Sequence, residues 1–165
     1  MINYVQRIKW FAGLVLFQVL VLNFAHISIY ATPFMYIYFI LRFDTGCGRT
    51  EIMLWSFALG LTVDIFSNTP GLGAAAATFL AFTRARLIRL VTLRELDEDF
   101  QPGMRTMGLA AYFRYALMGS LIFCTAAGML EYFSMANISV LLLKILSNTA
   151  ATLASLLCVE AVRRG

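Results

Sequence analysis

Residues 61–77 of the chain read LTVDIFSNTPGLGAAAA, and this stretch decides how the chain is expected to fold. Its first part continues an apolar run and contains one acid, Asp64. A turn-forming SNTPG follows at 67–71, and then comes a run of glycine and alanine. Apolar runs on both sides of a short polar turn are typical of two helices that cross a membrane and reverse outside it. The small residues predict close packing of the second helix against a neighbour.

The composition of the whole chain favours a membrane location. Of the 165 residues, 61% are hydrophobic and only 13% are charged, and the mean hydropathy is +0.79. These values exceed those of water-soluble domains, and several apolar segments in a chain of this length leave no room for a separate soluble domain. We therefore expect one all-α domain over residues 1–165, a polytopic bundle of membrane helices.

The apolar segments predict about six spans, of which the first two form a short hairpin. Pro33 disfavours helix at the residue before it, so this hairpin is expected to turn near HISIYATP, residues 26–33. The spans are predicted at about 10–26, 30–43, 52–66, 72–90, 108–130 and 138–162.

Lysine and arginine are distributed unevenly around these spans. The outer turns near 26–32, 67–71 and 131–137 contain neither residue, whereas most of the cations lie at the inner ends of the spans. The positive-inside rule therefore predicts that both termini are cytoplasmic. The basic amino terminus is expected to remain as a signal anchor, and the net charge of +4 is assigned to topology rather than to nucleic-acid binding.

Asp64 is the sharpest single feature, because an ionised side chain at the centre of a membrane helix costs about 2.5–3.5 kcal/mol. Three roles are open. Asp64 caps the turn or the start of the next helix, or it pairs with a buried cation, for which Lys144 is the candidate at a similar depth. In the third role it contributes to an outward-facing pocket for a small solute. Gln18, Asn23 and Asn148, together with Lys144, are the other polar candidates for that pocket.

The turn and the small residues after it are candidates for helix packing or partner contact. The residues concerned are Ser67, Pro70, Gly71, Gly73 and Ala77. If this face contacts another protein's span, phenylalanine at Gly73 or Ala77 should weaken that association.

The polar loop near residue 95 is the last candidate for a functional feature. Glu95, Asp97, Glu98 and Asp99 are expected to form a solvated helix extension that balances nearby arginines, with a docking surface for a cytoplasmic protein as the alternative. The sequence has one histidine, no C-x-x-C pair and no paired intramembrane carboxylates. It therefore predicts no catalytic, cofactor-binding or metal site.

The run FALGLTVDIFSNTPGLGAAAA, residues 57–77, resembles the MreD family of rod-shape membrane proteins. The hallmark of that family is Gly-Leu-x-x-Asp, two hydrophobic residues and Ser, then a turn, then Leu-Gly and small residues. The corresponding positions are Gly60, Leu61, Asp64, Ser67, Pro70, Gly71, Leu72 and Gly73. The earlier stretches LFQVLVLNF, 16–24, and TPFMYIYFILRF, 32–43, follow the family's order, and beyond residue 92 only hydropathy and length match.

This resemblance implies a non-enzymatic scaffold of the bacterial inner membrane that supports cell shape and peptidoglycan synthesis, without a cofactor. The implied partners are the bitopic protein MreC and, in the wider elongation complex, MreB, RodA and its transpeptidase. The family's fold resembles the six-helix substrate-binding subunit of energy-coupling-factor transporters. That likeness supplies the alternative function, a small-solute-binding or transport subunit with its pocket at Asp64.

Overall fold

The computed structural model describes residues 4–22, 33–69, 71–92, 100–131 and 138–164. Every regular element in these residues is a helix, which confirms the all-α prediction. The α-helices are α1 (Tyr4–Phe17), α2 (Ile37–Leu41), α3 (Arg49–Ser67), α4 (Leu72–Val91), α5 (Met104–Met107), α6 (Leu109–Glu131) and α7 (Ile138–Arg164), and a π-helix, η1 (Gln18–Leu22), continues α1.

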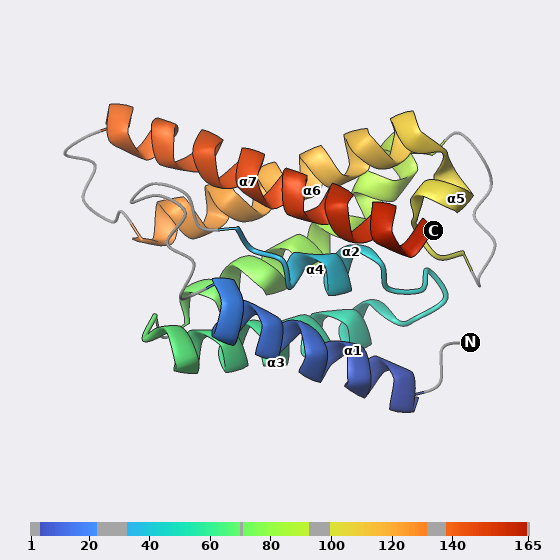
Figure 1. Ribbon diagram of the computed structural model, residues 1–165, viewed down its shortest axis with the longest axis horizontal. Coiled ribbons are helices and arrows are strands. Elements are labelled where there is room, and N and C mark those ends of the chain that lie inside the picture. The colour runs from blue at the N-terminus through green and yellow to red at the C-terminus, as the bar shows by residue number, and fades with distance from the viewer. Residues whose placement is uncertain (1–3, 23–32, 70, 93–99, 132–137, 165) are drawn as a thin grey trace.

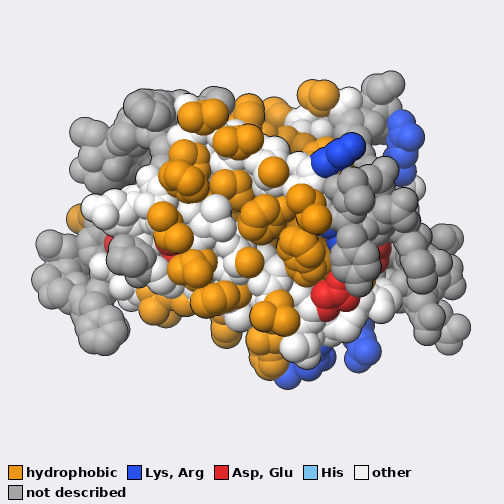
Figure 2. Space-filling model, turned by 90° about the horizontal axis from the view of Figure 1, so that it is seen from below, with side chains coloured by type: hydrophobic (Ala, Val, Ile, Leu, Met, Phe, Trp, Pro, Cys, Tyr) orange, Lys and Arg blue, Asp and Glu red, His pale blue; other side chains and the backbone are white. Residues whose placement is uncertain are grey.

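Three of these helices are long and apolar enough to cross a membrane: α3, α6 and the Ile138–Val162 part of α7. They support the predicted membrane location. Helix α4 is equally long, but its last part carries Arg84, Arg86 and Arg89. Many large apolar side chains on the helices are exposed, as a lipid environment requires. Figure 2 shows one face of the molecule, over which hydrophobic side chains are spread. Most of the lysines and arginines on this face lie toward one end.

The bundle has a central element flanked by two pairs of helices. Figure 1 shows the short α2 in the middle of the bundle, with α1 and α3 on one side of it and α6 and α7 on the other. Helix α4 packs against both α3 and α6, and so connects the two sides. Helix α1 begins and α7 ends at the same end of the bundle, beside α5, and the turn between α3 and α4 lies at the opposite end.

The centre of the core is the segment 33–43. All five residues of α2 are buried, and the side chains of Ile37 and Ile40 are completely inaccessible. Just before α2, the rings of Phe34 and Tyr36 pack on Phe123 of α6, with centroids 5.1 and 5.6 Å from it. This segment therefore holds the two sides of the bundle together.

The second predicted span differs from the structure. Within the described part of the segment predicted at 30–43, the α-helix extends only over Ile37–Leu41, and Pro33 and Phe34 precede it without regular structure. The helix does not extend to Pro33 because proline has no N–H and because the Phe34 and Met35 amides bond to side chains of other helices. The apolar character of this segment reflects burial in protein rather than contact with lipid.

Candidate functional site

The α3–α4 hairpin is built on one very close helix contact. A Cβ atom placed on Gly60 would lie 2.6 Å from the Cα of Ala74 and 2.7 Å from the carbonyl oxygen of Gly73. Only glycine fits at this position, because any side chain would separate the two backbones. This contact fixes α3 against the first turn of α4.

Asp64 caps the start of α4, as the first of the three predicted roles required. It is 2% exposed, and its Oδ1 and Oδ2 accept hydrogen bonds of 2.9 Å from the backbone N–H groups of Gly73 and Ala74. The hydroxyl of Thr69 donates to Oδ1 at 3.3 Å. These amides have no partner inside their own helix, and the positive end of the helix dipole favours the carboxylate. The charge is therefore satisfied by the chain itself.

The turn uses two left-handed backbone conformations. Asn68 ends α3 with φ 56°, and its N–H donates to the Asp64 carbonyl, while Gly71 precedes α4 with φ 86°. Ser67 is the last residue of α3. Pro70 lies outside the described residues. The predicted turn is thus confirmed around that gap, with glycine at a position that other residues rarely occupy.

The predicted pair between Asp64 and Lys144 is wrong. Lys144 Nζ lies 2.6 Å from Oε1 of Glu131, at the end of α6, whereas the Asp64 oxygens are bonded to α4 and the turn. Lys144 already has a carboxylate partner at the end of the bundle, so an acid from α3 is not required to neutralise its charge.

A charge exchange should therefore fail to rescue folding. Asp64→Lys places a cation against the amides of α4 and is expected to abolish folded protein, and adding Lys144→Asp should restore none of it. Lys144→Gln alone should change the melting temperature in detergent little, because partly exposed ion pairs contribute about 0–1 kcal/mol. Yields of monodisperse protein for the two single variants and the double variant give the measurement. Recovery in the double variant would contradict the assignment.

The variant Asp64→Asn tests whether the fold requires the negative charge of Asp64 or only its capping hydrogen bonds. Asparagine keeps one acceptor oxygen but turns an NH₂ group toward an amide N–H, so one buried donor loses its bond. We expect a loss of about 1–2 kcal/mol in the free energy of unfolding, with the protein still folded. The control is Glu131→Gln, which makes the same chemical change at a side chain that is 45% exposed. Equal unfolding free energies in the two variants would argue against the cap.

The small-residue face is used within the chain. Ala77 is completely buried, and a Cβ on Gly73 would lie 2.5 Å from Asp64 Oδ1 and 2.9 Å from the Tyr36 hydroxyl. The prediction that this face contacts another protein's span is therefore wrong at Gly73, where Asp64 of α3 and Tyr36 of the central segment occupy the space, and at Ala77, which is completely buried. Phenylalanine at either position tests folding, not association.

Gln18 fixes the entry to the central segment. Its Nε2 donates to the Pro33 carbonyl at 3.1 Å, and its Oε1 accepts from the Met35 N–H at 2.9 Å. From the other side of the bundle, Thr152 of α7 accepts from the Phe34 N–H at 3.1 Å. Two helices thus satisfy backbone groups that an irregular segment would otherwise bury unpaired. Asn148, one turn before Thr152, is also buried, and Asn23 lies outside the described residues.

The exit from the central segment is held by a buried arginine. Arg84 of α4 is 2% exposed and donates to the carbonyl oxygens of Leu41 and Phe43, and the Tyr115 hydroxyl of α6 donates to Leu41 at 2.9 Å. These carbonyls lie at the C-terminal end of α2, where a helix has acceptors without partners and favours a cation.

Glu160, near the end of α7, joins three elements at the arginine-rich end. It is 5% exposed, accepts from the Tyr38 hydroxyl at 2.6 Å and forms an ion pair with Arg42 at 2.8 Å. Its Oε1 also accepts from the Met104 N–H at 3.1 Å, at the start of α5. The carboxylate therefore links α7 to both the central segment and α5.

Arg7 of α1 makes a second charged cluster at the same end. Its guanidinium lies 3.3 Å from Asp44 and 2.6 Å from Glu51, and it donates to the Cys47 sulfur at 3.0 Å. Burial raises the pKa of the Cys47 thiol, and the hydrogen bond from Arg7 opposes that rise.

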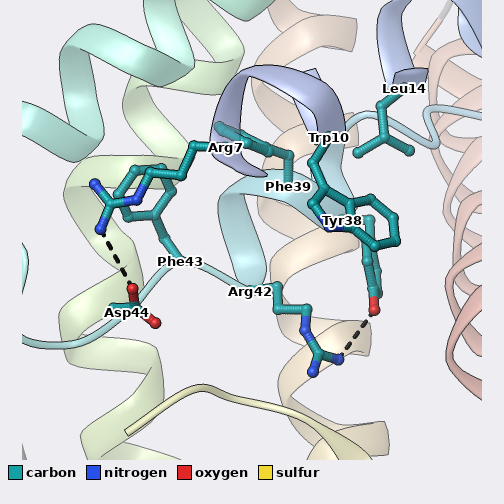
Figure 3. Close-up of a pocket in the computed structure, with 8 residues that line it drawn as sticks. All are labelled: Arg7, Trp10, Leu14, Tyr38, Phe39, Arg42, Phe43 and Asp44. Atoms are coloured by element: carbon teal, nitrogen blue, oxygen red, sulfur yellow. Dashed lines mark hydrogen bonds and ion pairs between the residues drawn. The ribbon is translucent and has the colours of Figure 1, made fainter. Parts of the chain in front are cut away.

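A small pocket of about 40 Å³ lies between the two clusters. Figure 3 shows Arg7 and Asp44 on one side, Trp10 and Tyr38 on the other, and Arg42 between them. Two buried polar atoms next to this pocket have no hydrogen-bond partner within the described chain, Arg42 Nε and Asp44 Oδ1. This pocket, called the polar pocket below, has charged side chains in its lining and lies at the opposite end of the bundle from Asp64.

Sequence reasoning had assigned no site role to Arg42, Asp44, Arg84 or Glu160. The available signal was that acids occur inside or beside apolar segments at Asp44 and Glu160, where a counter-ion is required. The acidic stretch Glu95, Asp97, Glu98 and Asp99 lies outside the described residues, so its predicted role stays a prediction.

Comparison of the chain with models of protein families, with curated proteins and with solved structures finds no match.

Proposed function

We propose that this chain is a non-enzymatic scaffold of the bacterial inner membrane that binds MreC within the cell-elongation complex. In this proposal the chain crosses the membrane six times, the second time through the segment 33–43 that is buried among the other helices, and both termini are cytoplasmic. Its work is to hold partner spans in place for peptidoglycan synthesis. MreB, RodA and its transpeptidase are the wider partners. The basis of the proposal is the family resemblance of residues 57–77 together with the way in which the interior is used.

The observation that carries the proposal is the α3–α4 hairpin. The positions that match the family hallmark and fall within the described residues have packing or capping roles: Gly60 admits the backbone of α4, Asp64 binds its first amides, and Gly71 adopts a positive φ. A hallmark of this kind is expected of a protein selected for a rigid helical shape. Each of these positions therefore has a physical reason for its residue type.

The buried polar side chains support a structural role as well. Gln18, Thr152 and Arg84 bond to the backbone of the central segment from three different elements. Such contacts stabilise one arrangement of the bundle, as a scaffold requires.

The alternative function, solute binding at Asp64, receives no support from this geometry. Both carboxylate oxygens are bonded to backbone amides, and a Cβ on Gly73 would already touch Oδ1. A solute would have to displace the cap of α4.

The test is capture of MreC by the tagged full chain from membranes of the host, combined with photo-crosslinking. A photoreactive residue replaces Ile65 of α3, which is 71% exposed, or Leu146 of α7, which is 64% exposed. We expect MreC to copurify and to crosslink at one of these faces but not at both, because a single span covers one side of the bundle. Absence of MreC from the purified complex, with the chain folded and abundant, would contradict the proposal.

A further inference from the structure

A groove lies between α1 and α7, two helices that Figure 1 shows on opposite sides of the central α2. It is lined by residues of α1, by Val159 of α7 and by Met35 of the central segment. The groove has a volume of about 380 Å³, within the range of small-molecule sites. The α1 residues that line it are Lys9, Trp10, Gly13, Leu14 and Phe17.

The groove and the polar pocket lie next to each other on α1. Trp10 and Leu14 line both of them. Along α1 the lining therefore changes from charged, at Arg7 and Lys9, to apolar, at Leu14 and Phe17. A site that is charged at the membrane boundary and apolar farther in has the polarity of one leaflet of a bilayer.

Two residues that line the polar pocket each have a buried polar atom without a hydrogen-bond partner in the described chain. Arg42 Nε is a buried N–H donor without a partner, and Asp44 Oδ1 is a buried acceptor without a partner on a residue that is only 7% exposed. Each costs free energy when left unbonded. A ligand that accepts from Arg42 and donates to Asp44 would satisfy both atoms.

The charges around the pocket and groove further restrict the class of ligand. Three cations around the pocket and groove are matched by three carboxylates: Arg7, Lys9 and Arg42 against Asp44, Glu51 and Glu160. Arg7 is shared by two of the acids, while exposed Lys9 has no carboxylate partner among the described residues. The site therefore has an excess of negative charge at Asp44 and of positive charge at Lys9, which complements a group of zero net charge that carries both signs.

We propose that the groove between α1 and α7 binds a phospholipid of the adjoining leaflet whose headgroup carries a primary ammonium beside its phosphate, as in phosphatidylethanolamine. An acyl chain lies along Gly13, Phe17 and Val159. The phosphate accepts from Arg42 Nε and is attracted by Lys9, and the ammonium donates to Asp44 Oδ1. A membrane helix in the same groove would leave the Asp44 and Arg42 atoms unpaired, so a lipid fits the charges better. This inference does not depend on the proposed scaffold role.

Native mass spectrometry of the purified full chain tests the proposal with three lipids that share the same oleoyl chains. These are phosphatidylethanolamine, phosphatidylcholine and phosphatidylglycerol. We expect the first to bind about tenfold more tightly than the second, because methylation removes the N–H donors that face Asp44, a charge-assisted bond. Phosphatidylglycerol should also bind less tightly than phosphatidylethanolamine, because it has no cation for Asp44. Equal affinities, or a preference for phosphatidylglycerol, would overturn the proposal.

Two variants locate the site. Asp44→Asn should reduce the preference for phosphatidylethanolamine over phosphatidylcholine toward one, because the amide carries no charge. Gly13→Leu should weaken the binding of all three lipids. The substitution is compatible with the fold because a Cβ at Gly13 meets no atom within 4 Å. Circular dichroism and gel filtration show whether each variant is folded. A folded Gly13→Leu protein that keeps wild-type lipid affinity would place the lipid elsewhere and contradict the proposal, whatever the result for Asp44→Asn.

Discussion

Replacing Gly60 by alanine is expected to lower the melting temperature of the purified protein sharply or to abolish folded protein. The new methyl carbon would lie 2.6–2.7 Å from backbone atoms of Gly73 and Ala74, and no side chain can move away to relieve the contact. Overpacking in a core usually costs about 1–3 kcal/mol, and more when a backbone must shift. Separation of α3 from α4 would also lengthen the bonds from Asp64 to the Gly73 and Ala74 amides.

The control for this variant is Gly13→Ala in α1, also within a helix but with open space around the added carbon. Alanine has the higher helix propensity, so this change should leave the melting temperature unchanged or raise it slightly. Thermal unfolding in detergent, followed by circular dichroism, compares the two variants. Similar melting temperatures for Gly60→Ala and the wild type would show that the helices are not in close contact at this point.

Glu160→Ala is expected to have the second large effect. It removes the carboxylate that accepts from the Tyr38 hydroxyl and the Met104 N–H and that neutralises Arg42. Removing one partner of a buried ion pair costs about 3–5 kcal/mol. Because the Arg42 side chain is 19% exposed and can reach water, we expect a value near the lower end, about 3 kcal/mol.

A double-mutant cycle isolates the ion pair within that loss. Arg42→Met removes the cation, and with Glu160→Ala it gives the interaction free energy from the two single variants and the double variant. We expect the double variant to be more stable than the sum of the single losses predicts, because no unpaired charge remains. Strictly additive losses would show that Arg42 and Glu160 are not in contact in the folded protein.

The sequence predicted the fold class and the hairpin because these depend on local patterns. Long apolar runs separated by short polar turns indicate helices, and SNTPG with the glycines after it indicates the reversal after Ser67. Capping of α4 was one of the roles predicted for Asp64. The sequence could suggest it because the Asp64 carboxylate and the amides that it binds are only nine and ten residues apart. Contacts at this separation can be judged from the sequence.

The central segment could not be predicted in the same way. An apolar stretch that is buried in protein has the same composition as one that faces lipid, so the short α2 resembled half of a spanning hairpin. Its bonds to Thr152 and Glu160 join residues 118 or more apart. The expectation that Lys144 pairs with Asp64 failed for a related reason, since depth along a helix does not say which neighbour a side chain faces.

The interior of the bundle gives structural roles both to Gln18, which the sequence offered for a ligand site, and to buried charged residues that the sequence did not single out. Gln18, Arg84 and Glu160 all bond to the central segment 33–43, from three different helical elements. A bundle fixed in this way presents a constant outer surface to other spans.

Cell shape provides the most direct test of the central claim, that this chain is a scaffold of the elongation complex. The measurement is the width and length of host cells after deletion of the chain, with and without a plasmid that supplies it. We expect deletion to give round or widened cells, wild-type chain and Asp64→Asn to restore rods, and Gly60→Ala to fail. Cells that remain rods of unchanged width after deletion would contradict the account.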